Sequence, residues 1–220
     1  MDRLALKEAC EAVPLFPLPG VVLFPNTVMP LHVFEQRYRD LVKDCLEGNG
    51  VLGVPLLAPG WEDGYDGQPP VHPIAGVGQI IESRKLPDGR YNIAVLGVGR
   101  IRIVSEYPTD QLYRIARADL LEENLPAGGV DALRAPLEQL RLLLAQLLML
   151  HPRLQADLGK LVEVRDPSFQ MVDALAHLVF QEPEQRQRYI EEDDLLARTE
   201  QVSEGLAGII ARSTSNIPEA

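Results

Sequence analysis

The stretch from residue 14 to residue 42, PLFPLPGVVLFPNTVMPLHVFEQRYRDLV, limits the possible folds more than any other part of the chain. It contains three short apolar runs at residues 13–16, 21–24 and 28–33, which predict strands separated by proline or glycine. Because proline has no N–H to donate to a ladder, we expect these strands to be short and edge-like. After them the apolar spacing becomes helical, with one stripe at Phe34, Tyr38, Leu41, Val42 and Cys45.

The same run resembles the opening of the N-terminal substrate-binding domain of Lon proteases. The resemblance rests on the spacing of the prolines, the Phe34-Glu35 pair and the Arg37-Tyr38 pair. It implies an α+β fold: a small, twisted, partly closed β-sheet of the pseudouridine-synthase-associated type with one helix, followed by a C-terminal helical bundle. The resemblance extends over residues 14–212. Specific motifs carry it at the start of this range, and only the order of the predicted elements carries it in the helices.

Composition excludes several classes of protein. With 46% hydrophobic residues over 220 positions, the chain has the profile of a soluble globular protein. The net charge of −11 opposes non-specific binding to nucleic acid or to anionic membranes. The longest apolar run, residues 142–150, is much shorter than the roughly 20 residues that span a bilayer. The first residues show no signal-peptide pattern, so a cytoplasmic protein is expected.

Cysteine and histidine give no sign of a metal site or of a cofactor. Cys10 and Cys45 are too far apart in sequence to form a ligand pair, and they are expected to be small buried side chains. The four histidines are scattered singly, without the close spacing of metal ligands. We therefore expect neither a metal nor a cofactor.

The pattern along the chain predicts an N-terminal tail at residues 1–12, a β-rich subdomain at 13–123, a helical bundle at 130–212 and a C-terminal tail at 213–220. Within the β-rich part, Pro87-Asp88-Gly89 predicts a tight turn between two long strands. Further strands are expected at residues 51–57, 76–86, 91–106 and 112–121, and a hinge is expected at 124–129.

Four helices are predicted in the second half of the chain. The first covers residues 132–150, with Pro136 close to its first turn. The second follows an Asp166-Pro167 cap, and the third begins at Glu182-Pro183. The last carries an apolar stripe at Leu195, Val202, Leu206 and Ile209.

Motifs for catalysis are missing from the sequence. The one Gly-Lys pair, Gly159-Lys160, is followed by leucine, so it does not complete an ATPase phosphate loop. The residues after the predicted bundle are too few for the Ser-Lys peptidase module of a Lon protease, and no Gly-x-Ser-x-Gly elbow occurs. The Gly-Val-Gly triplets at residues 76–78 and 97–99 predict strand kinks or bulges and do not complete a dinucleotide fingerprint. We therefore expect a protein that is not an enzyme.

The resemblance implies a protein-binding module that recognises unfolded or exposed polypeptide segments, as an adaptor in protein quality control. A separate Lon protease is a further candidate partner. Such recognition requires an exposed apolar surface or a free sheet edge. Core packing, a solvated helix face and a loop anchor are the alternative roles of the candidate residues, which are Met29, Leu31, Glu35, Gln36, Arg37, Trp61 and Tyr65.

A second class of function is binding of RNA through a basic sheet face. Residues 79–118 contain seven basic and four acidic side chains within an otherwise acidic protein. Polar strand positions paired across the sheet would give the same pattern. No aromatic ladder accompanies the basic residues, so RNA ranks below polypeptide as a partner. The candidate basic residues are Arg84, Arg100, Arg102 and Arg114.

Overall fold

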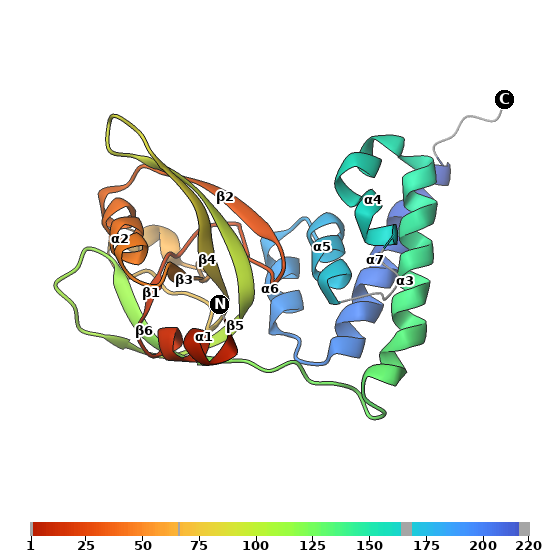
Figure 1. The fold of residues 1–220 in the computed structure, drawn as a ribbon, viewed down its shortest axis with the longest axis horizontal. Helices are drawn as coiled ribbons and strands as arrows, with labels where there is room; N and C mark the ends of the chain where they lie inside the picture. The colour runs from red at the N-terminus through yellow and green to blue at the C-terminus, as the bar shows by residue number, and fades with distance from the viewer. Residues whose placement is uncertain (1, 66, 164–168, 216–220) are drawn as a thin grey trace. The chain divides into compact units, whose positions relative to one another are not determined.

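The computed structural model describes residues 2–65, 67–163 and 169–215. The chain divides into two compact units, shown as ribbons in Figure 1. The barrel unit consists of Met1–Glu122 together with Glu182–Glu191, and the helical unit consists of Glu123–Gln181 together with Glu192–Ala220. This division differs from the predicted one because a short helix near residue 190 belongs to the barrel unit.

Six strands form one mixed sheet that closes on itself. Its strand order is β2-β5-β4-β3-β1-β6, and β5 pairs in addition with β6. Strands β1 and β3 are parallel, and the other pairings are antiparallel. The strand β2 is left at an edge, paired with β5 only. The strands are β1 Val13–Leu15, β2 Val28–Val33, β3 Val51–Val54, β4 Ile74–Lys85, β5 Tyr91–Tyr107 and β6 Arg114–Leu120.

The predicted turn between the two longest strands is confirmed. The Gly89 N–H donates to the Leu86 carbonyl oxygen at 2.9 Å. Gly89 has a φ of +83°, a conformation that glycine adopts without steric cost. The turn therefore joins β4 to β5 as the Pro-Asp-Gly sequence indicates.

The Gly-Val-Gly triplets allow a chain segment to lie directly on the sheet. A β-carbon on Gly76 would lie 2.0 Å from the Leu23 carbonyl oxygen, and one on Gly97 would lie 2.0 Å from that of Phe24. The sheet register also shifts between Val77 and Gly78, as expected of a bulge. Residues 21–24, predicted as a strand, form no strand; they cross the sheet over these glycines.

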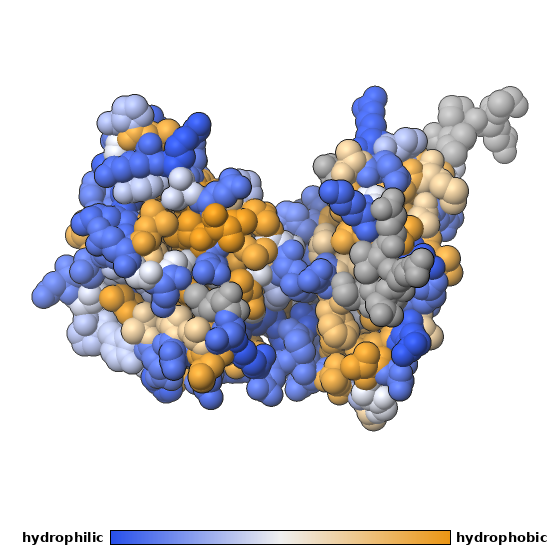
Figure 2. Space-filling view, viewed as in Figure 1, coloured by the Kyte–Doolittle hydropathy of each residue, from blue (hydrophilic) through white to orange (hydrophobic). Residues whose placement is uncertain are grey.

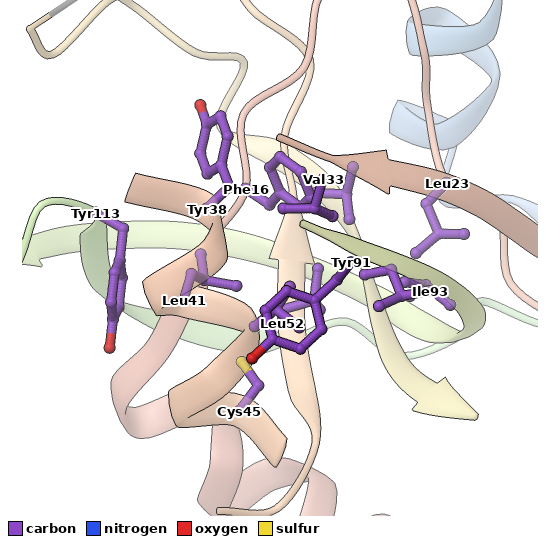
Figure 3. Close-up of a cluster of buried hydrophobic side chains, with 13 residues drawn as sticks. Phe16, Leu23, Val33, Tyr38, Leu41, Cys45, Leu52, Tyr91, Ile93 and Tyr113 are labelled. Atoms are coloured by element: carbon purple, nitrogen blue, oxygen red, sulfur yellow. The ribbon is translucent and has the colours of Figure 1, made fainter. Parts of the chain in front are cut away.

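Two helices pack on the barrel near the start of the chain. Helix α1, Arg3–Ala9, and the 3₁₀ turn Cys10–Ala12 occupy the predicted N-terminal tail, and Cys10 is buried there. Helix α2, Gln36–Glu47, buries its predicted stripe in the core shown in Figure 3. Phe34 departs from that stripe: it precedes α2 and is 61% exposed. A further 3₁₀ turn, Trp61–Gly64, lies in the loop between β3 and β4.

The helical unit confirms most of the predicted elements. Pro136 lies inside α3, beyond its first turn, because that helix begins earlier than predicted. The predicted Asp166-Pro167 cap lies outside the described residues. Within the described residues, no helix is both long enough and apolar enough to span a membrane. The helices are α3 Val130–Leu150, α4 Gln155–Glu163, α5 Phe169–Val179 and α7 Leu195–Ser215, with the 3₁₀ turn Pro152–Leu154 between α3 and α4.

The last helix keeps its predicted face with one change. Leu195, Val202 and Leu206 are buried, and Ile210 is buried in place of Ile209. The helix predicted to begin at Glu182-Pro183 is α6, Pro183–Glu191, and it is the helix that belongs to the barrel unit.

Candidate functional site

The edge strand β2 presents backbone groups that no other described strand uses. The Gly97 N–H donates to the Thr27 carbonyl oxygen at 2.9 Å, which fixes the alternation of the ladder with β5. Residues 27, 29 and 31 therefore direct their backbone groups to β5. Val28, Pro30 and His32 direct theirs away from the sheet. Pro30 thus stands where its missing N–H costs no bond within the sheet.

The outer face of the sheet beside this edge is partly apolar. Val28 is 54% exposed and lies opposite Leu96 in the register, while Pro30 lies opposite Ala94. Ile81, at the bulge in β4, is also exposed. Figure 2 shows a hydrophobic band on the barrel unit where β2, β4 and β5 run in Figure 1. We call the outer face around Val28, Pro30, Ile81, Ala94 and Leu96 the β2 surface. A shallow hollow within it is lined by Pro30, Glu82, Ser83, Arg84, Asn92, Ile93 and Ala94.

An aromatic pair ends the β2 surface. The rings of His32 and Phe34 are nearly parallel, with centroids 6.3 Å apart. The Nδ1 atom of His32 lies 2.6 Å from the Asn92 side-chain oxygen, which holds the imidazole against β5. Sequence spacing did not indicate this pair, because a stripe of helical spacing assigned Phe34 to the core.

Met29 and Leu31 lie on the inner side of the same strand. Both are half-buried and pack against the core that α2 covers. Packing in the core, one of the two roles expected from the sequence, therefore buries most of the surface of both side chains. Only their remaining exposed atoms border the β2 surface.

Four of the candidate residues meet at the start of α2. The Tyr65 hydroxyl donates to Glu35 Oε1 at 2.7 Å. Arg37 donates to the Tyr65 carbonyl oxygen at 2.9 Å and to Glu35 Oε2 at 2.9 Å. The ring of Trp61 packs edge-on against that of Tyr65, with centroids 5.4 Å apart. We call these four residues the loop clamp, because they hold residues 58–73 to α2.

The clamp is partly shielded from water, and this changes the acidity of its members. Burial raises the pKa of the Tyr65 hydroxyl, and the hydrogen bond to Glu35 raises it further. The Arg37 guanidinium also stacks on the rings of Tyr38 and Tyr65, at 4.6 and 4.7 Å. Gln36, by contrast, is exposed and donates to Asp40 at 2.8 Å. It takes no part in the clamp.

A second arginine ties the same loop from the other side. Arg114 donates to the Pro69 carbonyl oxygen at 2.7 Å and forms an ion pair with Glu106. A small pocket lies between Arg37 and Arg114, lined also by Tyr38 and Tyr113. Both guanidinium groups already face a carboxylate, so the pocket carries little net charge for a ligand.

The four arginines of the predicted basic face do not share one solvent-facing surface. Arg100 is 1% exposed and donates to the Ile190 carbonyl oxygen at 2.9 Å. Arg114 is held by Glu106 and by the loop. Only Arg84 and Arg102 are exposed. Alternation along β5 predicted Arg100 to be solvent-facing, but α6 covers that position.

Metal-ligating groups do not converge in the part of the chain that the structure describes. Among those residues, no three His, Cys, Asp or Glu side chains lie close enough to hold an ion. Cys10 and Cys45 are free thiols in the core. Burial raises the pKa of Cys10 to about 11 and that of Cys45 to about 12, so both remain protonated near neutral pH.

Comparison with solved structures places the fold. The N-terminal domain of the Mycobacterium avium complex Lon protease matches 89% of this chain and 98% of its own, with a TM-score of 0.68 and 14% identity. A Lon N-terminal domain protein from Xanthomonas campestris matches 87% of this chain and 96% of its own, with a TM-score of 0.58 and 25% identity. The α+β class and the barrel-then-helices order predicted from the sequence are confirmed.

Sequence relatives extend well beyond the matched region. Lon protease 2 of Myxococcus xanthus is 29% identical over 194 residues, which are 88% of this chain and 23% of the relative. The Lon protease of Anaeromyxobacter dehalogenans is 28% identical over 199 residues, which are 90% of this chain and 23% of the relative. The chain thus spans less than a quarter of the length of either protein.

A family model covers nearly the whole chain. The model for the ATP-dependent protease La (LON) substrate-binding domain matches residues 12–208, which include every strand, most of the helices, the β2 surface and the loop clamp. By this match the chain belongs to the Lon substrate-binding domain family.

Proposed function

We propose that the barrel unit binds unfolded or exposed polypeptide segments, which pair as an added strand with the outward edge of β2. The observation that supports this is the edge itself. Val28 and His32 each direct an N–H and a carbonyl away from the sheet, and Pro30 adds a carbonyl. In such strand addition, backbone hydrogen bonds supply affinity and side-chain contacts supply selectivity. On the β2 surface those contacts would be with Val28, Pro30 and Phe34.

The spacing of the donors sets a minimum length for the bound segment. The only outward N–H groups of β2 are those of Val28 and His32, because Pro30 has none. A strand advances about 3.3 Å per residue, so a segment must be extended over about five residues to accept from both. Apolar side chains at alternate positions would lie beside Val28 and Pro30.

Family membership supports a role in substrate recognition, and we extend it here to an adaptor role in protein quality control. In this proposal the bound segment belongs to a non-native protein in the cytoplasm, and a separate Lon protease receives it. The buried free thiols of Cys10 and Cys45 are compatible with a reducing compartment.

We infer that the role is non-catalytic. Among the described residues, His151 Nε2 and Ser213 Oγ are spaced as a nucleophile-base pair would be, 2.8 Å apart. The Ser213 hydroxyl also bonds the Ile209 carbonyl oxygen at 2.9 Å, as helical serines commonly do. Within the described residues, this arrangement links the ends of α3 and α7, and no acidic side chain is seen to orient the histidine.

A matched pair of substitutions at His32 tests the edge. His32→Ala removes the imidazole and keeps the outward N–H, whereas His32→Pro removes both. The loss of one backbone hydrogen bond of about 0.5–1.5 kcal/mol should weaken peptide binding about twofold to tenfold in His32→Pro relative to His32→Ala. Fluorescence anisotropy with a labelled apolar peptide in extended form measures this. Equal affinity of the two variants, with both folded, would contradict strand addition at β2.

Salt and Trp61 separate this mode from binding of RNA. Apolar and backbone contacts are not screened, so binding of a denatured model protein should persist as the Debye length falls from about 10 to about 3 Å between about 0.1 and 1 M salt. Trp61 is half-buried against Tyr65, and in this proposal its exposed edge supplies a second apolar contact to the bound chain, so Trp61→Ala should weaken that binding while leaving the fold intact. Binding that salt abolishes and that Trp61→Ala leaves unchanged would favour RNA and the exposed Arg84 and Arg102. No binding at either salt concentration would exclude the polypeptide role.

A further inference from the structure

Helix α6 completes the barrel although its neighbours in sequence belong to the helical unit. Tyr189 and Ile190 of α6 are 1% and 0% exposed. The ring of Tyr189 packs edge-on against Phe24, with centroids 4.9 Å apart. Helix α6 therefore packs on the barrel through buried side chains, and we call the barrel surface that receives it the groove.

Polar contacts fix the register of α6 in the groove. Arg100, 1% exposed, donates to the Ile190 carbonyl oxygen at 2.9 Å. Gln187 donates from its side chain to the Ile74 carbonyl oxygen at 2.9 Å. The carbonyl at the C-terminal end of α6 is thus one of the acceptors of this buried guanidinium, together with the Glu122 carbonyl oxygen at 3.4 Å. These two contacts fix where α6 lies along the barrel.

The chain reaches α6 only through the helical unit. Gln181 before it and Glu192 after it both belong to that unit. Apart from α6 itself, the barrel unit is joined to the rest of the chain by one covalent connection, between Glu122 and Glu123. If α6 dissociates from its groove, it stays attached to the helical unit at both of its ends. The rest of the barrel unit is then linked to them only through the bond between Glu122 and Glu123.

That connection is short. On one side, the Leu121 N–H donates to the Arg100 carbonyl oxygen at 2.9 Å within the barrel unit. On the other side, the Asn124 N–H donates to the Asp193 carbonyl oxygen at 3.2 Å within the helical unit. Glu122 and Glu123 alone lie between these two anchored residues. Short connections of this kind favour exchange of segments between copies.

From this topology we propose that α6 of one copy docks in the barrel groove of a second copy, which gives a dimer by exchange of the helical unit together with α6. Each barrel in that dimer keeps every contact of α6 described above, supplied by the partner copy. The free energy of the α6 contacts is then the same in monomer and dimer. Protein concentration and the conformation of residues 121–124 decide between the two forms.

A disulfide placed across the groove identifies the exchanged form. A β-carbon on Gly20 would lie 3.9 Å from Pro183 Cγ, the first residue of α6. Copies carrying Gly20→Cys and copies carrying Pro183→Cys are unfolded together, refolded at high concentration and oxidised. We expect a covalent dimer in which mass mapping of peptides joins the two introduced thiols. The double variant, refolded when dilute, should form the same link within one chain, and this shows that the geometry permits it.

Two outcomes would overturn the proposal. One is a link in the double variant with none in the mixture. The other is needed because Gly20 has a φ of +73°, so cysteine there is strained and can prevent the link from forming in any variant. In that case, a finding by light scattering that wild-type protein refolded at high concentration is entirely monomeric would overturn the proposal. As a control, a flexible Gly-Ser insertion after Glu123 leaves α6 and its groove unchanged. It should reduce the dimer fraction severalfold, because a longer connection lets α6 return to its own barrel.

Discussion

The carbonyl oxygen of Phe24 lies 2.0 Å from the position that a β-carbon on Gly97 would occupy. The backbone of Phe24 therefore rests on β5 at a point where only glycine fits, and Gly76 makes the same provision for Leu23. This contact brings residues 21–24 across the sheet just before β2 begins. It thus sets where β2 starts, and with it the β2 surface.

Replacing Gly97 with alanine should destabilise the barrel unit. The methyl group must displace backbone atoms and not a flexible side chain, so the cost should reach or exceed about 3 kcal/mol, the upper end for overpacking. Chemical denaturation followed by circular dichroism measures the change. Gly64→Ala is the matched control, because a β-carbon there meets no atom within 4 Å. Similar stability of the two variants would show that residues 21–24 do not rest on β5.

Replacing Tyr65 with phenylalanine should loosen the loop at residues 58–73. It removes the 2.7 Å hydrogen bond to Glu35 and leaves the ring stacked on Trp61. In the native protein we expect the first cuts of limited proteolysis at residues 124–129, where Gly128 and Gly129 have positive φ. In Tyr65→Phe, cuts at 58–73 should become as early as those at 124–129.

Tyr107→Phe is the control for that experiment. It also removes one tyrosine hydrogen bond, from its hydroxyl to the Glu11 carbonyl oxygen at 3.0 Å. Cleavage at 58–73 should be unchanged in this variant. First cuts inside β5 or α3 in any of the three proteins would mean that the units are divided elsewhere.

Arg198→Ala should strongly destabilise the helical unit. Arg198 on α7 is 1% exposed and forms ion pairs with Glu123 and with Asp173, which is itself 4% exposed. Removing the cation leaves Asp173 buried without it, at a cost of about 3–5 kcal/mol. The exposed pair of Arg134 and Asp131 supplies the control, and Arg134→Ala should cost about 0–1 kcal/mol. Equal melting temperatures for the two variants would contradict this.

The buried thiols should make the protein sensitive to alkali. In the folded state the pKa of Cys10 is raised from 9.0 to about 11, so folding holds this proton more tightly than the unfolded chain does. The corresponding stability is present below pH 9.0 and is lost as pH rises towards 11, and Cys45 behaves alike up to about 12. Near neutral pH, a thiol reagent should react slowly with the folded protein and at once in denaturant. Rapid reaction of both thiols in the folded state would refute their burial.

Local chemistry made much of the fold predictable. The proline-broken strands, the helix after them and the turn at Gly89 depend on backbone geometry that the residues themselves impose. The loop clamp was predictable only as separate candidates, because Glu35 and Tyr65 are joined by tertiary structure and not by spacing.

Other features required the tertiary structure. An amphipathic pattern shows which face of α6 is buried but not that the barrel covers it. For the same reason Arg100, which alternates with apolar residues along β5, was predicted to be exposed although α6 shields it. Phe34 continues a helical stripe in sequence, yet it precedes the first turn of α2 and so points elsewhere.

Pro30 has a consequence for the fate of the protein at high concentration. An exposed sheet edge can recruit further edges and grow into a fibre, unless something interrupts the row of donors. With Pro30 at the centre of its outward face, β2 offers donors only at its two ends. Those two donors can still bind a short extended segment. If the β2 edges of two copies paired, each would lack the donor at Pro30, so the ladder between them would lose hydrogen bonds. The residue that weakens this edge as a template for aggregation would therefore also limit the number of backbone hydrogen bonds to a segment bound in the proposed mode.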